Sequence, residues 1–166
     1  MDYEVTFDEY LISAHAGRLQ PEVIWDFLHR ESDWARGIPY EVMLRTLAHS
    51  LNFGAYTSDG RQVGFARIVT DYGQFAYLCD VFILAPYRGQ GLGKALVKAA
   101  LAHPALRNLR RYALDASDDA RSLYAELGFA PSEGGGTWRY GIAPRNCGRR
   151  LRLRAATANG RPPDPF

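Results

Sequence analysis

The chain has 166 residues, 47% of them hydrophobic and 23% charged, with a formal net charge of +2. These values suit one compact globular domain, and no apolar run approaches the roughly 20 residues that a helix needs to cross a bilayer. The first residues are acidic where a signal peptide would be basic, which predicts a chain without a secretory leader.

The first third of the chain predicts a strand and two helices. Residues 3–7 alternate between apolar and polar side chains, as a short strand does. Residues 21–30 predict an amphipathic helix that begins with a proline, and residues 39–50 predict a second helix with one apolar face. The loop between the two helices holds Trp34 and Gly37.

The middle of the chain predicts three strands. Residues 53–57 and 62–69 form a hairpin across the turn at residues 58–60, which ends in glycine. Residues 74–84 are a nearly continuous apolar run, which indicates a buried central strand.

The last elements alternate between helix and strand. Residues 92–102 and 118–127 predict helices, and the second has acidic residues in its first turn and Gly128 just past its end. Residues 111–116 and 138–143 predict strands. The whole order indicates a mixed α/β fold, and no internal repeat is visible.

Basic residues are concentrated at the C-terminal end. Residues 145–166 hold six arginines against one aspartate, whereas the rest of the chain holds 14 basic and 17 acidic side chains. We therefore expect one domain over residues 1–144 and a basic, disordered tail over residues 145–166. A nucleic-acid partner would rest on this tail alone, so neither nucleic acid nor membrane is expected as a partner, and a homodimer stays open.

The two cysteines, Cys79 and Cys147, form neither a disulfide framework nor a metal-ligand pattern. The four histidines are scattered without the spacing of metal ligands. We expect no metal, and a reduced, cytoplasmic setting.

A glycine-rich turn joins the central strand to the next helix, in the sequence Arg88-Gly89-Gln90-Gly91-Leu92-Gly93-Lys94. Backbone N–H groups at a helix N-terminus point outward, and the helix dipole favours negative charge there. Glycines allow a close backbone approach, and two flanking cations add positive charge. The turn therefore predicts a phosphate or pyrophosphate site.

Spacing excludes two familiar phosphate loops. A P-loop would need a glycine at position 88 and Ser or Thr at position 95, where the chain has Arg88 and Ala95. The dinucleotide motif would need its third glycine at position 94, which is Lys94. What remains is Arg-x-x-Gly-x-Gly at Arg88, Gly91 and Gly93.

This motif resembles the acetyl-CoA pyrophosphate loop of the GNAT superfamily of N-acyltransferases. The segment 119–129 is also similar to a later helix motif of that family, A-x-x-L-Y-x-x-x-G-F. The resemblance runs from about residue 51 to residue 143, with both motifs in the expected order. It implies the GNAT fold: a central mixed, mostly antiparallel sheet with splayed central strands and helices on both faces.

The resemblance also implies how acetyl-CoA is held. The pantetheine arm would lie along Val81, Phe82 and Ile83, and the pyrophosphate on the loop from Arg88 to Lys94. Family members commonly have asparagine where this chain has Ser117, so that contact to the arm is weakened or moved. An ordinary helix N-cap is the alternative role for Ser117.

For catalysis, the resemblance implies that Tyr124 donates a proton to the departing CoA thiolate. The alternative is that Tyr124 only packs on the sheet. Asp80 is the candidate that attracts the amine or accepts its proton through water, and a structural carboxylate is the alternative. Asp80 and Cys79 are neighbours on a strand, so both can face the substrate only across a bulge.

The amine pocket of this family is built from the early helices and their loop. That region of the chain is aromatic, and its aromatic residues include Trp25, Phe27, Trp34, Tyr40, Tyr72 and Phe75. Such side chains can hold a cation on their π faces, although core packing explains most of them equally well.

The sequence is therefore interpreted as an acetyl-CoA-dependent N-acetyltransferase that acts on a small amine by direct attack, without an acyl-enzyme. The alternative is a non-catalytic acyl-CoA-binding sensor or partner module, which keeps the loop but needs no acid. The presence of Tyr124 favours the enzyme.

Overall fold

The structure is a computed structural model, and it describes residues 3–131 and 139–142. Its strands are β1 (Glu4–Phe7), β2 (Tyr10–Ser13), β3 (Leu51–Tyr56), β4 (Gln62–Thr70), β5 (Phe75–Ile83), β6 (Arg111–Asp115), β7 (Ala130–Pro131) and β8 (Arg139–Ile142). They form one sheet in the order β1-β2-β3-β4-β5-β6-β8-β7. Every described neighbour pair is antiparallel except β5 and β6, which are parallel.

The helices are α1 (Pro21–Asp26), which continues into the π-helical turn η2 (Phe27–Glu31), then α2 (Tyr40–Ala48), α3 (Leu92–Leu101) and α4 (Arg121–Glu126). Short 3₁₀ turns lie at η1 (Ala16–Arg18), η3 (Ala85–Tyr87), η4 (Pro104–Leu106) and η5 (Asp118–Ala120). Among the described residues, no helix is both long and apolar enough to pass through a bilayer.

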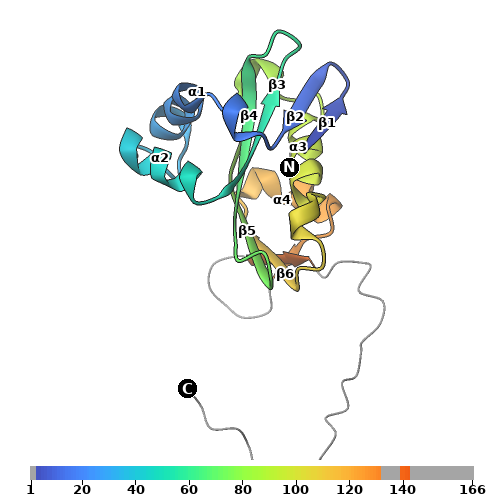
Figure 1. The fold of residues 1–166 in the computed structure, drawn as a ribbon. Coiled ribbons are helices and arrows are strands. Elements are labelled where there is room, and N and C mark those ends of the chain that lie inside the picture. Colours follow the sequence, from blue (N-terminus) through green and yellow to red (C-terminus); the bar gives the residue numbers. More distant parts are fainter. Residues whose placement is uncertain (1–2, 132–138, 143–166) are drawn as a thin grey trace, which may run out of the picture.

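The helices cover both faces of the sheet (Figure 1), as the family resemblance implies. α1 and α2 bury Ile24 and Met43 against one face, where Phe82 stacks on Phe27 with 3.9 Å between ring centroids. α3 buries its apolar stripe against the other face, in one cluster with Tyr124 of α4. Because α3 and α4 share this face, the start of α3 and the body of α4 lie on the same side of β5.

The central strands separate after a short parallel pairing. β5 and β6 are paired only at Phe75, Ala76 and Tyr77 of β5, and the pairing of β5 with β4 continues to Ile83. From Leu78 onward the β6-facing edge of β5 therefore has no strand partner within the described chain. The predicted splayed strands are confirmed, and they leave backbone groups of β5 open to a ligand.

A bulge interrupts β5 beside this opening. Phe65 of β4 pairs with Phe82, whereas Arg67 pairs with Cys79, so Asp80 and Val81 stand opposite one residue of β4. Asp80 has a left-handed backbone with φ of 53°. This is the bulge that the sequence requires if Cys79 and Asp80 are to face the same side.

Two strands were not predicted. β2 forms a hairpin with β1 across a turn in which Asp8 takes a φ of 49°, a role more often filled by glycine or asparagine. β7 has two residues, too few for any period. The predictions for the tail and for both ends of the last strand, residues 138 and 143, lie outside the described residues.

Candidate active site

The glycine-rich turn forms a pocket of about 370 Å³, which we call the loop pocket. It is lined by the turn and by one side of α4: Ile83, Tyr87, Arg88, Gly89, Gly91, Leu92, Gly93, Lys94, Ser122, Leu123 and Glu126. Of the predicted loop residues, Gln90 is not in this lining, and its side-chain oxygen accepts a hydrogen bond from Tyr10 at 2.9 Å.

Backbone amides at the start of α3 are free to bind an anion. Gly91 is the N-cap and has a φ of 80°, and the first helical bond of α3 runs from the Ala95 amide to the Gly91 carbonyl at 3.0 Å. Within the described chain, the amides of Leu92 and Gly93 have no backbone acceptor. The first turn of α3 contains no acidic side chain, so nothing in it competes for these donors.

Both cations of the loop pocket have protein partners. The Nε of Arg88 donates to the Ile83 carbonyl at 2.7 Å, which ties the turn to the end of β5. Lys94 forms an ion pair with Glu126 of α4. The hydrogen bond from Lys94 holds the pKa of Glu126 below its usual value, so this carboxylate is charged inside a site that otherwise suits an anion.

A second pocket, of about 690 Å³, lies in the gap between β5 and β6. This gap pocket is lined by Asp33, Trp34, Arg67, Val69, Tyr77, Leu78, Cys79, Asp80, Val81, Asp115, Ala116, Ser117, Ala120 and Tyr124. Val81 lines the gap pocket and Ile83 the loop pocket, and on α4 Tyr124 and Leu123 divide in the same way. The two pockets therefore follow one another end to end along β5 and lie on different sides of α4.

Tyr124 lies in the wall of the gap pocket and is 7% exposed. Its ring packs edge-on against Phe129, with 5.8 Å between centroids. Its hydroxyl has no hydrogen-bond partner among the residues that the structure describes. Burial, and to a lesser degree the neighbouring Cys79, raise the pKa of Tyr124 to about 12, so it holds its proton at neutral pH.

Asp80 lies in the same pocket with both carboxylate oxygens engaged. One accepts from the Nε of Arg67 at 2.7 Å, and the other from the indole N–H of Trp34 at 3.1 Å. The side chains of Arg67 and Asp80 are only 15% and 12% exposed. Asp80 therefore has a structural partner and also lines the pocket, so the two roles considered from the sequence are both compatible with its position.

Two further residues of the gap pocket were named from the sequence. Ser117 precedes η5 and its side chain makes no capping bond there, but its hydrogen bond holds the pKa of Asp119 below the usual value. Burial raises the pKa of the Cys79 thiol to about 12, so Cys79 is protonated and a poor nucleophile at neutral pH.

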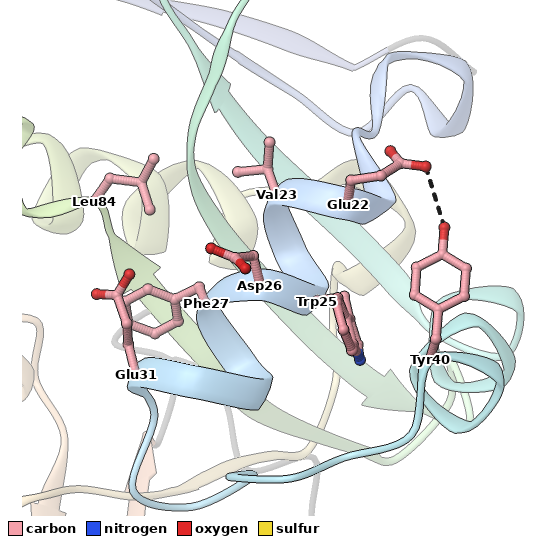
Figure 2. Close-up of a pocket in the computed structure, with 8 residues that line it drawn as sticks. All are labelled: Glu22, Val23, Trp25, Asp26, Phe27, Glu31, Tyr40 and Leu84. Atoms are coloured by element: carbon pink, nitrogen blue, oxygen red, sulfur yellow. Dashed lines mark hydrogen bonds between the residues drawn. The ribbon is translucent and has the colours of Figure 1, made fainter.

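The aromatic residues of the early helices divide between two places. Trp34 lines the gap pocket, whereas Trp25, Phe27 and Tyr40 line a separate pocket of about 780 Å³ beside α1 and α2 (Figure 2). Phe82 stacks on Phe27 on this side of the sheet, so the side chain of Phe82 faces away from the loop and gap pockets.

Three functional candidates were missed from the sequence: Arg67, Asp115 and Glu126. Arg67 had a usable signal, because it is the one charged residue in β4 and a charge in an apolar strand needs a partner. In the described part of the chain, no group of three or more metal-ligating side chains is found.

Comparison with known proteins shows the family of the chain. Residues 20–129 match the model of the acetyltransferase (GNAT) family. A protein of Gibberella zeae assigned as an acetyltransferase is 28% identical over 149 residues, which cover 76% of this chain and 78% of that protein. GCN5-related N-acetyltransferase 2 of Arabidopsis thaliana is 33% identical over 76 residues, which cover 46% of this chain and 30% of the plant protein.

Comparison with solved structures leads to the same family. A crystal structure from Xanthomonas campestris pv. campestris, assigned to the GNAT family, has a TM-score of 0.72 and 44% identity over 77% of this chain and 89% of that one. A GNAT acetyltransferase from Elizabethkingia anophelis with acetyl-CoA bound has a TM-score of 0.58 and 17% identity, over 76% and 80% of the two chains, and shows the shared fold. Since the family model covers most of the described residues and the same fold recurs in these structures, the chain belongs to the acetyltransferase (GNAT) family.

Proposed function

We propose that the protein transfers an acetyl group from acetyl-CoA to the nitrogen of a small amine by direct attack in a ternary complex. The observation that carries this proposal is the end-to-end arrangement of the loop and gap pockets, with Tyr124 in the wall of the second. A thioester arm that begins at the loop pocket and runs along β5 would bring its reactive end to Tyr124.

The residues present fit acetyl-CoA. The Leu92 and Gly93 amides and the two cations of the loop pocket suit the diphosphate. The β5 edge beyond Tyr77 offers backbone donors and acceptors to the amides of the pantetheine arm. The described residues of the gap pocket hold three carboxylates against one guanidinium, which favours a cationic acceptor.

The reaction needs a neutral amine, because a primary ammonium titrates near ~10. The amine loses a proton to water, and its nitrogen attacks the thioester carbonyl. The C–N bond forms, the C–S bond breaks, and the nitrogen releases its second proton to solvent. The sulfur leaves as a thiolate and takes the phenolic proton of Tyr124, which solvent then replaces. Cys79 takes no part, since its thiol stays protonated.

A panel of primary amines, assayed for CoA release with acetyl-CoA, tests the proposal. We expect release that depends on the amine and an N-acetylated product by mass spectrometry. Tight acetyl-CoA binding without acetylation of any amine would instead favour a sensor that binds acyl-CoA without catalysis.

Changing Asp80 to Asn should raise the KM for the amine and leave the Kd for acetyl-CoA unchanged. The carboxylate acts on a cationic acceptor, whereas the loop pocket lies further along β5. The change also leaves Arg67 without its charged partner, so we expect the free energy of unfolding to fall by roughly 1.5–3 kcal/mol, the contribution of a hydrogen bond between charged groups. Steady-state kinetics, calorimetry and thermal melting measure the three quantities.

Asp59→Asn is the matched control, because Asp59 also pairs with an arginine, Arg61 at 2.8 Å, but on an exposed hairpin. That solvent-screened pair should contribute little to stability, and its loss should change neither KM nor Kd. If Asp80→Asn weakens acetyl-CoA binding as much as it raises the amine KM, Asp80 supports the whole site rather than the acceptor.

Changing Glu126 to Gln should tighten acetyl-CoA binding several-fold. Glu126 is a charged carboxylate in the loop pocket, and its removal frees Lys94 for the phosphates of the ligand. Calorimetry at low and moderate salt measures the effect, with Glu41→Gln on the exposed start of α2 as the control. Weaker binding in Glu126→Gln would mean that the carboxylate positions Lys94 for the ligand.

A further inference from the structure

The outer end of the gap pocket has an apolar wall that faces solvent. In the part of the chain that the structure describes, the exposed large hydrophobic side chains are Trp34, Leu44, Val69 and Tyr72. Two of them, Trp34 and Val69, line the gap pocket. Trp34 is 56% exposed, so much of its large aromatic ring is open to a molecule in the pocket.

Trp34 is nevertheless held in place. Its indole N–H donates to Asp80 at 3.1 Å, and Asp80 is in turn fixed by Arg67, whose Nη1 donates to the Ser50 hydroxyl at 3.1 Å. The ring lies 6.3 Å from that of Phe27, between centroids. The indole is therefore a preformed surface, which lowers the cost of ordering it when a ligand binds.

The loop that carries Trp34 is anchored on both sides. The Ser32 hydroxyl donates to the Leu28 carbonyl at 2.6 Å and accepts from the Ala35 amide at 3.1 Å. Further along, the Gly37 amide donates to the His29 carbonyl at 2.9 Å. The position of the indole at the pocket mouth is thus set by the backbone of its loop as well as by Asp80.

The charged and the apolar residues of the gap pocket suit different parts of one ligand. Asp80 of β5, whose side chain is only 12% exposed, lies deeper in the gap than Trp34 and favours the ammonium group. Trp34 and Val69 offer apolar area at the mouth, and the carboxylate next to Trp34 in the chain, Asp33, already pairs with Arg36 at 3.2 Å. Val69 is 42% exposed, so this apolar area is open to a ligand.

We propose that Trp34 determines acceptor specificity, and that the acceptor is a primary amine with one positive charge and an aromatic or long apolar arm. The arm lies on Trp34 and Val69, and the nitrogen points inward toward the thioester. This inference rests on the proposed acetyl transfer and adds the class of amine.

The test compares three amines at saturating acetyl-CoA: 2-phenylethylamine, ethylamine without an arm, and spermidine with further charges. The enzyme should have its highest kcat/KM for 2-phenylethylamine. Trp34→Ala should lower the ratio of the kcat/KM for 2-phenylethylamine to that for ethylamine by roughly 10-fold or more. Trp34→Phe loses the bond to Asp80 but keeps an aromatic ring. Because the ring carries the arm, this variant should retain most of the preference for 2-phenylethylamine.

Leu44→Ala is the matched control, because Leu44 is also an exposed apolar residue but lines none of the three pockets described above. This variant should keep the parent kcat/KM for all three amines. A parallel loss for all three amines in Trp34→Ala, or a parent preference for ethylamine or spermidine, would overturn the proposal.

Calorimetry with CoA present separates this inference from the proposed function. If 2-phenylethylamine binds the parent and loses affinity in Trp34→Ala while no amine is acetylated, acetyl transfer fails and the acceptor site stands. If amines are acetylated but the arm makes no difference to binding or turnover, the transfer stands and the role of Trp34 is refuted.

Discussion

Replacing Tyr124 with phenylalanine is expected to lower kcat by about 10²–10⁴-fold, the usual contribution of a general acid. The Kd for acetyl-CoA and the melting temperature should change little, because phenylalanine keeps the ring and its packing on Phe129. Single-turnover kinetics should accompany the steady-state assay, so that slow product release does not hide the effect.

The environment of Tyr124 determines its protonation state. With a pKa raised to about 12 by burial, the phenol stays protonated across the range in which an amine becomes neutral. The phenol is thus a donor throughout that range. Any rise of rate with pH between about 7 and 10 should therefore persist in Tyr124→Phe, since it reports the amine.

Tyr112→Phe is the control for losing a buried hydroxyl. Tyr112 is 7% exposed like Tyr124, but its hydroxyl donates to the Leu106 carbonyl at 2.7 Å and it lies outside the three pockets. This change should lower stability slightly and leave kcat intact. An unchanged single-turnover rate in Tyr124→Phe would assign Tyr124 to packing and the proton to water.

Replacing Gly91 with valine is expected to weaken acetyl-CoA binding by about 100-fold or more. Valine is disfavoured at a φ of 80°, and relaxing the N-cap turns the first amides of α3 away from the diphosphate. Two charge-assisted hydrogen bonds contribute roughly 1.5–3 kcal/mol each, which sets the magnitude. Calorimetry with acetyl-CoA measures it.

Gly60→Val controls for backbone strain, because Gly60 has nearly the same φ of 83° but lies in the β3–β4 turn. Both variants should melt at lower temperature, and only Gly91→Val should lose affinity. Parent-like binding by a folded Gly91→Val protein would show that the turn does not hold the diphosphate.

The parts of the site that sequence reasoning predicted are those built from neighbours along the chain. A glycine at the start of a helix and a strand before it are local features, and Gly91 does adopt the left-handed backbone of an N-cap. The same holds for Gly128, whose φ of 91° ends α4 as its position predicts. The splayed strands came from the family resemblance, since no local pattern encodes where two strands part.

The parts that were missed depend on contacts across the fold. Trp34 and Asp80 are 46 residues apart, and Lys94 and Glu126 are 32 apart, so their bonds exist only once the sheet has formed. The bulge at Asp80 could be stated only as a condition, because it depends on the register between β4 and β5. Glu126 gave no signal, since an exposed glutamate on a short helix is ordinary.

Because β5 and β6 pair over only a short stretch, a ligand in the gap helps to hold the two parts of the sheet together. Three residue pairs join the five strands β1–β5 to β6, β8 and β7, so little backbone hydrogen bonding crosses this seam. A molecule bound in the gap contacts both sides, and part of its binding free energy becomes free energy that holds the two parts of the sheet together. We therefore expect the two parts of the sheet to separate more easily without a ligand than with one.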